Sequence, residues 1–345
     1  MFSDGKEIVA SSAVTAEGAF APVIEVLSES SEWIILSHSK PDGDTLGSGS
    51  ALFSVGKALG KSVVWGGADS FSPKYAFLAG AEEYRPGLLL SSLSLSERSA
   101  VIALDTSTLE RSVEDLAVLP GSVPLLNIDH HPDNERFGTV NHVDSSVSSV
   151  GELLWLLFRE WGVPLGRDAA EALYTAISSD SGNFTFSCTG SRTHLAASDL
   201  LTLGVSPEKI NERIRCNASL PGLRLRATAM GRAFLVRNFA AFTWLRESDF
   251  ARTGSDPADT ESLVNDLLTL KGISFAAFFV EDTDSVRVSL RSRGEIAAAD
   301  IAHVFDGGGH PQAAGCRISL PLSEALESVR RLVEEKHAEW LALAE

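Results

Sequence analysis

Two short segments of the chain combine histidine and aspartate in a way that suits metal binding. His38, Asp42 and Asp44 occupy a turn-rich segment directly after an apolar run, and residues 129–131 read Asp-His-His directly after another. Carboxylate oxygens and imidazole nitrogens are ligands for Mn2+ or Mg2+, and histidine favours Mn2+. Taken alone, the first segment is also compatible with a polar turn, because Asp and Gly are common turn formers, and the second tripeptide can arise by chance. Together the two segments indicate metal chemistry.

The elements that must position these residues are strands of an α/β fold. Apolar runs at Trp33–Ser37, Ala100–Leu104 and Pro124–Ile128 predict strands, and polar side chains begin where each run stops. A loop is expected over 38–50, with helical spacing at Ala51–Leu59. Strands that alternate with helices predict a largely parallel sheet flanked by helices on both faces. Because ligands bind beyond the carboxyl ends of such strands, side chains distant in sequence can converge on one site.

The pattern changes after residue 205. Residues 206–232 are helical in pattern and rich in arginine, which predicts a linker. This linker would join a catalytic domain of residues 1–205 to a smaller α/β substrate-binding domain of residues 233–345, in which Ala240–Leu245 is one expected strand. We expect the active site to lie in the cleft between the two domains.

Composition limits the kind of partner. The 345 residues are 44% hydrophobic and 22% charged, as in ordinary globular proteins, and nothing predicts a membrane or secretion segment. The net charge of −17 argues against long nucleic acid, whose phosphate backbone is bound through many Lys and Arg contacts. A small anionic ligand remains compatible with a local positive site. Widely separated Cys188, Cys216 and Cys316 favour a reducing cytoplasm over a disulfide framework.

These motifs together resemble the DHH phosphoesterase family. The matching segments follow the family's order: 38–44 with Gly47 and Ser48, Asp105, the name-giving 129–131, and 180–184. Near the C-terminus, Gly307–His310 followed by Ala-Ala-Gly is similar to the signature of the DHH-associated nucleic-acid-binding domain. The resemblance covers roughly residues 30 to 320.

The resemblance implies a pair of divalent metal ions, with Mn2+ preferred and Mg2+ as the alternative. It makes His38, Asp42 and Asp105 ligands of one ion, and Asp44, Asp105, His130 and Asp180 ligands of the other. Asp105 would bridge the two ions. It implies that Asp129 orients a neighbouring histidine, and that His131 either contacts the scissile phosphate or protonates the leaving oxygen. Paired metal ions suit the hydrolysis of phosphoesters.

Substrate binding is expected from the second domain. Gly307, Gly308 and Gly309 could present successive N–H groups in a concave nest for an anion, although a flexible loop is the alternative. Arg291 and Arg293 end a predicted strand, where a guanidinium can bind phosphate in a bidentate way or remain solvated. The resemblance favours Arg291 and adds His310.

Within the family, the compact layout of this chain resembles that of the bifunctional oligoribonucleases and phosphatases of 3′-phosphoadenosine 5′-phosphate (pAp). This resemblance implies a Mn-dependent phosphoesterase that hydrolyses very short oligoribonucleotides to mononucleotides, pAp to AMP, or both. The alternatives are a cyclic-dinucleotide phosphodiesterase, a RecJ-like single-strand exonuclease, and a nucleotide-binding sensor without turnover. Expected partners are short oligonucleotides or small nucleotide phosphates, with no long duplex and no membrane. Homodimer formation is left open.

Overall fold

The computed structural model describes residues 18–216, 218–260, 263–294 and 296–344. The chain divides into two compact units, Met1–Asn217 and Ala218–Glu345. This division falls inside the segment expected to be a linker, which contains helix α6 (Pro207–Arg215) in the first unit and α7 (Leu220–Gly231) in the second. Within the described residues, every helix is too short or too polar to cross a bilayer.

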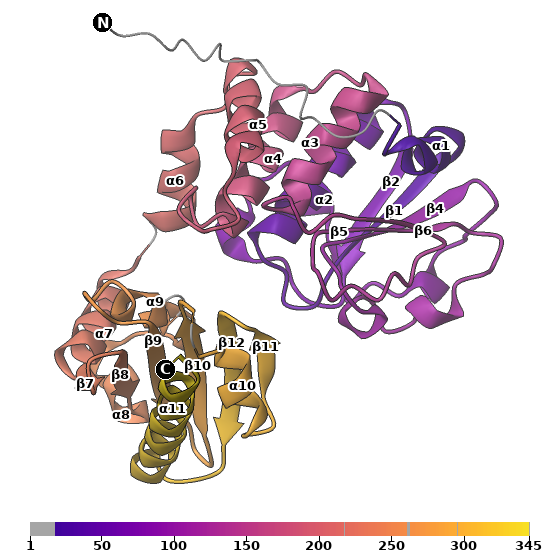
Figure 1. The fold of residues 1–345 in the computed structure, drawn as a ribbon. Coiled ribbons are helices and arrows are strands. Elements are labelled where there is room, and N and C mark those ends of the chain that lie inside the picture. The colour runs from indigo at the N-terminus through magenta and orange to yellow at the C-terminus, as the bar shows by residue number, and fades with distance from the viewer. Residues whose placement is uncertain (1–17, 217, 261–262, 295, 345) are drawn as a thin grey trace, which may run out of the picture. The chain divides into compact units, whose positions relative to one another are not determined.

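The first unit contains a six-stranded parallel sheet (Figure 1), as predicted. Its strand order is β3-β2-β1-β4-β5-β6. The strands are β1 (Glu32–Ser37), β2 (Ser62–Gly67), β3 (Arg85–Pro86), β4 (Ser99–Leu104), β5 (Leu125–Asp129) and β6 (Val140–Val143). Because β1, β4 and β5 are neighbours and run parallel, the residues that follow them emerge at the same edge of the sheet.

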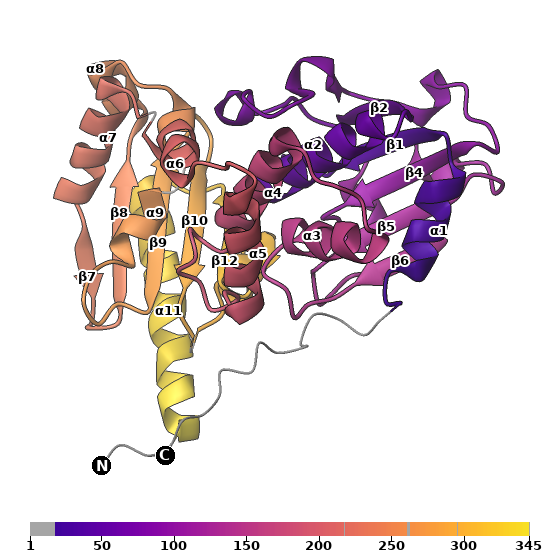
Figure 2. The ribbon, with the colours of Figure 1, turned by 90° about the horizontal axis from the view of Figure 1, so that it is seen from above.

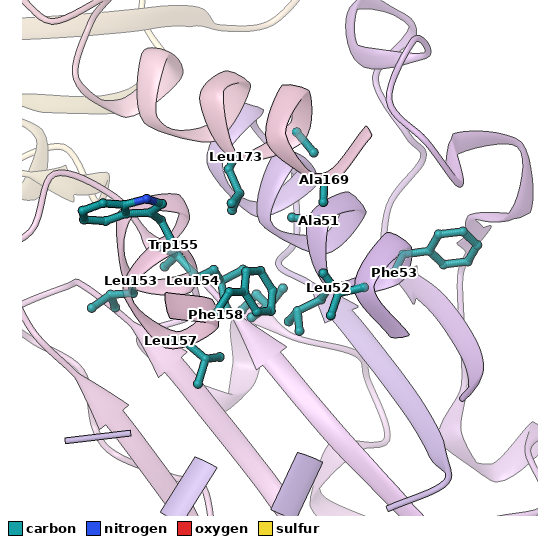
Figure 3. Close-up of a cluster of buried hydrophobic side chains, with 14 of the residues drawn as sticks. Ala51, Leu52, Phe53, Leu153, Leu154, Trp155, Leu157, Phe158, Ala169 and Leu173 are labelled. Carbon is teal, nitrogen blue, oxygen red and sulfur yellow. The ribbon is translucent and has the colours of Figure 1, made fainter. Parts of the chain in front are cut away.

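The two faces of this sheet are covered differently. One face packs against the α-helices α1 (Ala21–Glu29), α2 (Gly43–Ala58) and α3 (Val150–Trp161). Helix α4 (Arg167–Asp180) packs on α2 and α3, and α5 (Ser191–Thr202) packs on α3 and α4. Figure 3 shows part of this core, where Leu52, Leu154 and Phe158 lie between α2 and α3. On the other face, Ile34 and Leu36 of β1 pack against loops and short 3₁₀ helices. The prediction of helices on both faces is therefore correct for one face, whereas loops and short 3₁₀ helices cover the other.

Helix α2 begins earlier than the sequence suggested. The predicted loop over 38–50 is wrong from Gly43 onward, because Asp42 caps the helix by accepting hydrogen bonds from the N–H groups of Asp44 (3.0 Å) and Thr45 (3.3 Å). A Cβ at Gly47 would lie 2.6 Å from the carbonyl oxygen of Ala172 in α4. The glycines that suggest a turn thus allow α2 and α4 to pack closely.

The second unit contains a mixed six-stranded sheet, which confirms the predicted smaller α/β domain. Its order is β11-β12-β10-β9-β8-β7, with β8 and β9 parallel and the other pairs antiparallel. The strands are β7 (Phe234–Val236), β8 (Ala240–Leu245), β9 (Phe275–Glu281), β10 (Val286–Ser292), β11 (Gly308–His310) and β12 (Ala313–Ile318).

Helices cover both faces of this second sheet. One core contains residues of α10 (Ala298–His303) and α11 (Leu322–Ala344), and another contains residues of α7 and α9 (Leu263–Leu267). The short helix α8 (Glu247–Thr253) follows β8. Figures 1 and 2 show α11 and α9 on opposite sides of the sheet.

Candidate metal centre

Asp105 is the centre of the candidate site. It follows β4 with a φ of 57°, a left-handed conformation that is uncommon for residues other than glycine. Its buried carboxylate lies between two histidines: Oδ2 is 3.3 Å from Nε2 of His38, and Oδ1 is 3.5 Å from Nε2 of His130. The two oxygens therefore face different imidazoles, as a carboxylate shared by two cations would require.

The predicted metal ligands are brought together in the first unit. His38, Asp42 and Asp105 form one group, and Asp44, His130 and Asp180 form another, each with its ligand atoms within 4.8 Å of one another. Asp105, His130 and His131 form a third group by the same measure. In the second group, Nε2 of His130 lies 3.2 Å from Asp180 and 3.9 Å from Asp44.

His38 is fixed by the chain immediately around it. It is buried directly after β1, and its Nδ1 donates to the carbonyl oxygen of Ser39 at 2.8 Å. A hydrogen bond from one imidazole nitrogen leaves the other as the ligand atom. In His38 this other atom is Nε2, which faces Asp105.

Asp44 is held by a helix from a distant part of the chain. Its buried carboxylate accepts hydrogen bonds from the N–H groups of Val150 (2.7 Å) and Gly151 (3.0 Å) in the first turn of α3, and from the hydroxyl of Ser48 (3.2 Å). The partial positive charge at a helix N-terminus favours a carboxylate there. The packing of α3 beside α2 therefore fixes where Asp44 points.

The histidines of the cluster favour their protonated forms in this structure. Burial by itself would lower the pKa of His38, but interactions with Asp105 and Asp42 outweigh it and raise the pKa to about 11. His130 behaves similarly: burial opposes its charge, yet Asp105, Asp180 and Asp44 raise its pKa to about 12. Both imidazoles thus hold protons that a cation would displace.

The carboxylates respond to the same crowding in two ways. Burial, with the nearby charges of Asp105 and Asp180, raises the pKa of Asp44 well above its usual range. Burial also raises the pKa of Asp180, to about 6, with further contributions from Asp42 and Asp105. For Asp105, burial favours the neutral acid, but the two flanking histidines outweigh it and lower the pKa. Among these three carboxylates, Asp105 is therefore the one whose ionised form is stabilised by its neighbours.

The donor set fits divalent cations. Oδ1 of Asp105 and Nε2 of His130 are buried, and neither has a hydrogen-bond partner. Buried polar atoms without partners are uncommon in folded proteins and call for an explanation such as a bound ion. The surrounding ligands are carboxylate oxygens and imidazole nitrogens, with no thiolate among the three groups, a set that suits Mn2+ or Mg2+.

Asp129 connects the two histidines to a further residue that the sequence did not single out. Its Oδ1 accepts from the N–H of His130 at 2.8 Å and lies 2.7 Å from Nδ1 of His131. Its Oδ2 accepts from Nδ2 of Asn134 at 2.5 Å, and the same amide donates to the carbonyl oxygen of Thr106 at 3.0 Å. The geometry agrees with an orienting role for Asp129. The signal for Asn134 was weak, because asparagine in a polar turn is common.

The predicted substrate-binding arginines belong to the second unit. Arg291 lies near the end of β10, is half-buried, and donates from Nη1 to the carbonyl oxygen of Leu290 at 2.9 Å. Burial lowers the pKa of its guanidinium. Arg293 follows the strand with an exposed side chain, and its N–H donates to the carbonyl oxygen of Ser274 at 2.7 Å.

Two glycines of the run lie in an edge strand, and Gly307 directly precedes it. Gly308–His310 is strand β11, which pairs antiparallel with β12. A Cβ at Gly307 would lie 2.3 Å from the carbonyl oxygen of Gly315, and one at Gly309 would lie 2.5 Å from that of Ala313. The glycines therefore permit close approach of β12. The side chain of His310 lies outside the described part of the structure.

Comparison with known proteins identifies the family. Residues 32–177 match the DHH family N-terminal domain, and residues 239–339 match the DHHA1 domain. The bifunctional oligoribonuclease and PAP phosphatase NrnA of Bacillus subtilis (strain 168) is 30% identical over 292 residues, which cover 83% of this chain and 88% of that protein. The protein of the same name from Thermus thermophilus is 31% identical, with coverage of 88% and 89%. The chain belongs to the DHH family.

Membership confirms the predicted family and makes the chain a phosphoesterase, a hydrolase of phosphoester bonds. The fold agrees with that of an exopolyphosphatase-related protein from Bacteroides fragilis, whose crystal structure superposes with a TM-score of 0.87 at 24% identity. The superposition covers 97% of this chain and 100% of that one. The structure brings Asp180 and His130, which the sequence predicted as ligands of the same ion, to within 3.2 Å.

Proposed function

We propose that this DHH-family chain uses two divalent metal ions, preferably Mn2+, to hydrolyse very short oligoribonucleotides to mononucleotides and pAp to AMP. One observation carries the proposal: the buried carboxylate of Asp105 lies between Nε2 of His38 and Nε2 of His130. That arrangement suits a bridging ligand and fits few structural roles, since it leaves one carboxylate oxygen without a hydrogen bond.

The ligands divide between two ions that share Asp105. His38, Asp42 and Asp105 would hold one ion, and Asp44, Asp105, His130 and Asp180 the other. When bound, such a pair supplies a nucleophile from water at neutral pH and neutralises charge on the phosphoryl group. The N–H groups of α3 keep Asp44 in place for this task.

His131 is the proposed contact to the reacting phosphoester. Asp129 engages its Nδ1, so donation toward the substrate would come from Nε2. From there the imidazole would contact the scissile phosphate or protonate the leaving oxygen. Asp129 thus sets the orientation of His131 and stabilises its protonated form. Asn134 holds the second oxygen of Asp129.

The DHHA1 domain would bind the part of the substrate that lies away from the scissile bond. Arg291 and Arg293 supply guanidinium groups for a phosphate, and residues 307–310 supply backbone and the His310 imidazole. A few nearby contacts of this kind favour a substrate of a few nucleotides.

The substrate class rests on the relatives and on charge. The Bacillus and Thermus proteins are named as oligoribonucleases and PAP phosphatases. A net charge of −17 disfavours a long strand, which would gain little from counterion release on an acidic surface. Three free cysteines, two of them exposed, support the reducing cytoplasm as the compartment.

A single panel of substrates tests the proposal. Turnover would be measured with Mn2+, with Mg2+ and after chelation, on RNA of two to about thirty nucleotides, pAp, a cyclic dinucleotide, long single-stranded DNA and pyrophosphate. We expect metal-dependent kcat/KM to be highest for about two to five nucleotides and for pAp, and to fall steeply for longer strands. A rate that stays high at about thirty nucleotides would favour a RecJ-like exonuclease. Binding without turnover of any substrate would indicate a sensor.

A further inference from the structure

An exposed aromatic ring lies on the loop that follows Asp180. Phe186 is 57% exposed, although large apolar side chains normally gain stability from burial. The nearby Phe184 shows the contrast: its ring packs against Tyr174 at 5.7 Å and against His194 at 5.5 Å, measured between centroids. The chain thus uses one phenylalanine of this loop for packing and leaves the other in solvent.

The loop is held in a conformation that is costly for ordinary residues. Gly182, Asn183 and Phe184 all have left-handed backbones, with φ values of 57°, 59° and 65°. Such residues persist only where the surroundings fix them, and they cluster at functional sites. Here the N–H of Asn183 donates to Ser178 (2.8 Å), and the N–H groups of Phe184 (3.0 Å) and Phe186 (2.9 Å) donate to the hydroxyl and carbonyl oxygens of Ser181.

This conformation places the Phe186 ring beside the end of α4. A Cβ at Gly182 would lie 2.4 Å from the ring, so the ring packs directly against the glycine, two residues beyond Asp180. The loop also returns to Asp180 itself, since Sγ of Cys188 lies 3.8 Å from its carbonyl oxygen. The exposed ring is therefore tethered next to a proposed metal ligand.

We propose that Phe186 is a stacking platform for the nucleobase adjacent to the phosphate that is attacked. This inference rests on the proposed function, because it needs a nucleotide at the metal centre. Every base has a flat π face, and stacking on an aromatic side chain tolerates any base sequence. Stacking also adds affinity without cationic side chains, which suits an acidic protein.

The test compares substrates with and without a base. KM and kcat would be measured with Mn2+ for pAp and for a ribodinucleotide, each beside a matched analogue that has an abasic sugar. Phe186→Leu removes the aromatic face and keeps an apolar side chain, and Phe186→Trp restores the face. Phe234→Leu makes the same change at the other exposed phenylalanine among the described residues, which is 36% exposed and lies in β7.

We expect Phe186→Leu to raise KM about tenfold for the base-bearing substrates, while kcat and the abasic substrates change little. Phe186→Trp should return KM to the wild-type value or below it, and Phe234→Leu should resemble the wild type. Equal changes on base-bearing and abasic substrates would assign Phe186 a structural role and overturn the inference. If the wild type turns over these substrates and Phe186→Leu has no effect, the stacking role of Phe186 is rejected, while the proposed function stands. No turnover of pAp or dinucleotide by the wild type would reject the proposed function, and the platform with it.

Discussion

The two units place their predicted functional residues in opposite physical settings. In the first unit, Nε2 of His38 and Nε2 of His130 each lie within 3.5 Å of the buried carboxylate of Asp105, so Asp105 raises the pKa of both histidines. In the second unit, Arg291 and Arg293 lie along one strand and its end, and Arg293 is exposed. A crowded buried cluster acts as a unit, whereas two separate cations, one half-buried and one exposed, act one by one. Chemistry is thus expected from the first unit and uniform binding from the second.

The largest effect should follow from removing the shared carboxylate. We expect Asp105→Asn to lower kcat about a thousandfold or more and His130→Ala to act similarly, because either change removes charge stabilisation that is specific to the reaction. Turnover of a dinucleotide, metal content and the circular dichroism spectrum would be measured. Asp133→Asn, at an exposed position near His130, is the matched control. Near-normal turnover of Asp105→Asn with two ions bound would contradict the bridging role.

The next effect concerns pH. In the metal-free protein the pKa values of His38 and His130, about 11 and 12, keep both imidazoles protonated at pH 7.5. A metal ion binds only the neutral imidazole, and each ion takes one of these two histidines. Binding of both ions should therefore release about two histidine protons, and the affinity for each ion should rise about tenfold per pH unit between pH 7 and 8. Calorimetry in buffers of different ionisation enthalpy would count the protons. His130→Ala should release about one fewer, and an affinity independent of pH would show that the histidines are not ligands.

A smaller effect is expected in the second unit. Arg291→Ala should raise KM about tenfold with kcat nearly unchanged. The reason is that a contact that is equally strong in the ground state and the transition state contributes to substrate binding and not to the chemical step. Arg317→Ala is the control, since its guanidinium is exposed in β12 of the same unit and pairs with Asp282. Steady-state kinetics on a dinucleotide would separate the two parameters. A fall in kcat at constant KM would place Arg291 in the chemical step. It would contradict the assignment of chemistry to the first unit and of binding to the second.

The smallest effect should come from Asn134. Asn134→Ala removes the donor to Asp129 and should lower kcat about tenfold at constant KM, because it acts through the orientation of His131. Asn141→Ala is the matched control, since that amide bonds only to the backbone of Gly138 among the interactions described. Similar losses in both variants, or a change in KM alone, would show that Asn134 has only a structural part.

Local patterns in the sequence were enough to predict the sheet and the kind of chemistry. Apolar runs followed at once by His38, by Asp105 and by residues 129–131 predict strands with polar residues at their carboxyl ends, because a parallel strand is buried along its length and stops where polar side chains start. The family motifs then named the candidate ligands. Both predictions depend on neighbours in the chain, which the sequence displays directly.

Tertiary packing decided the rest. Helix α2 begins at Gly43 because its small residues face α4, and the N–H groups that hold Asp44 come from Val150 and Gly151, more than a hundred residues away. Residues 308–310 form a strand because β12 lies beside them. The contacts of Asn134 with Asp129 and the exposure of Phe186 likewise depend on how loops fold back on the sheet and on α4. Each of these features depends on strand register or on the close approach of segments that are far apart in the sequence. A local pattern of residue types does not determine which distant segments will meet.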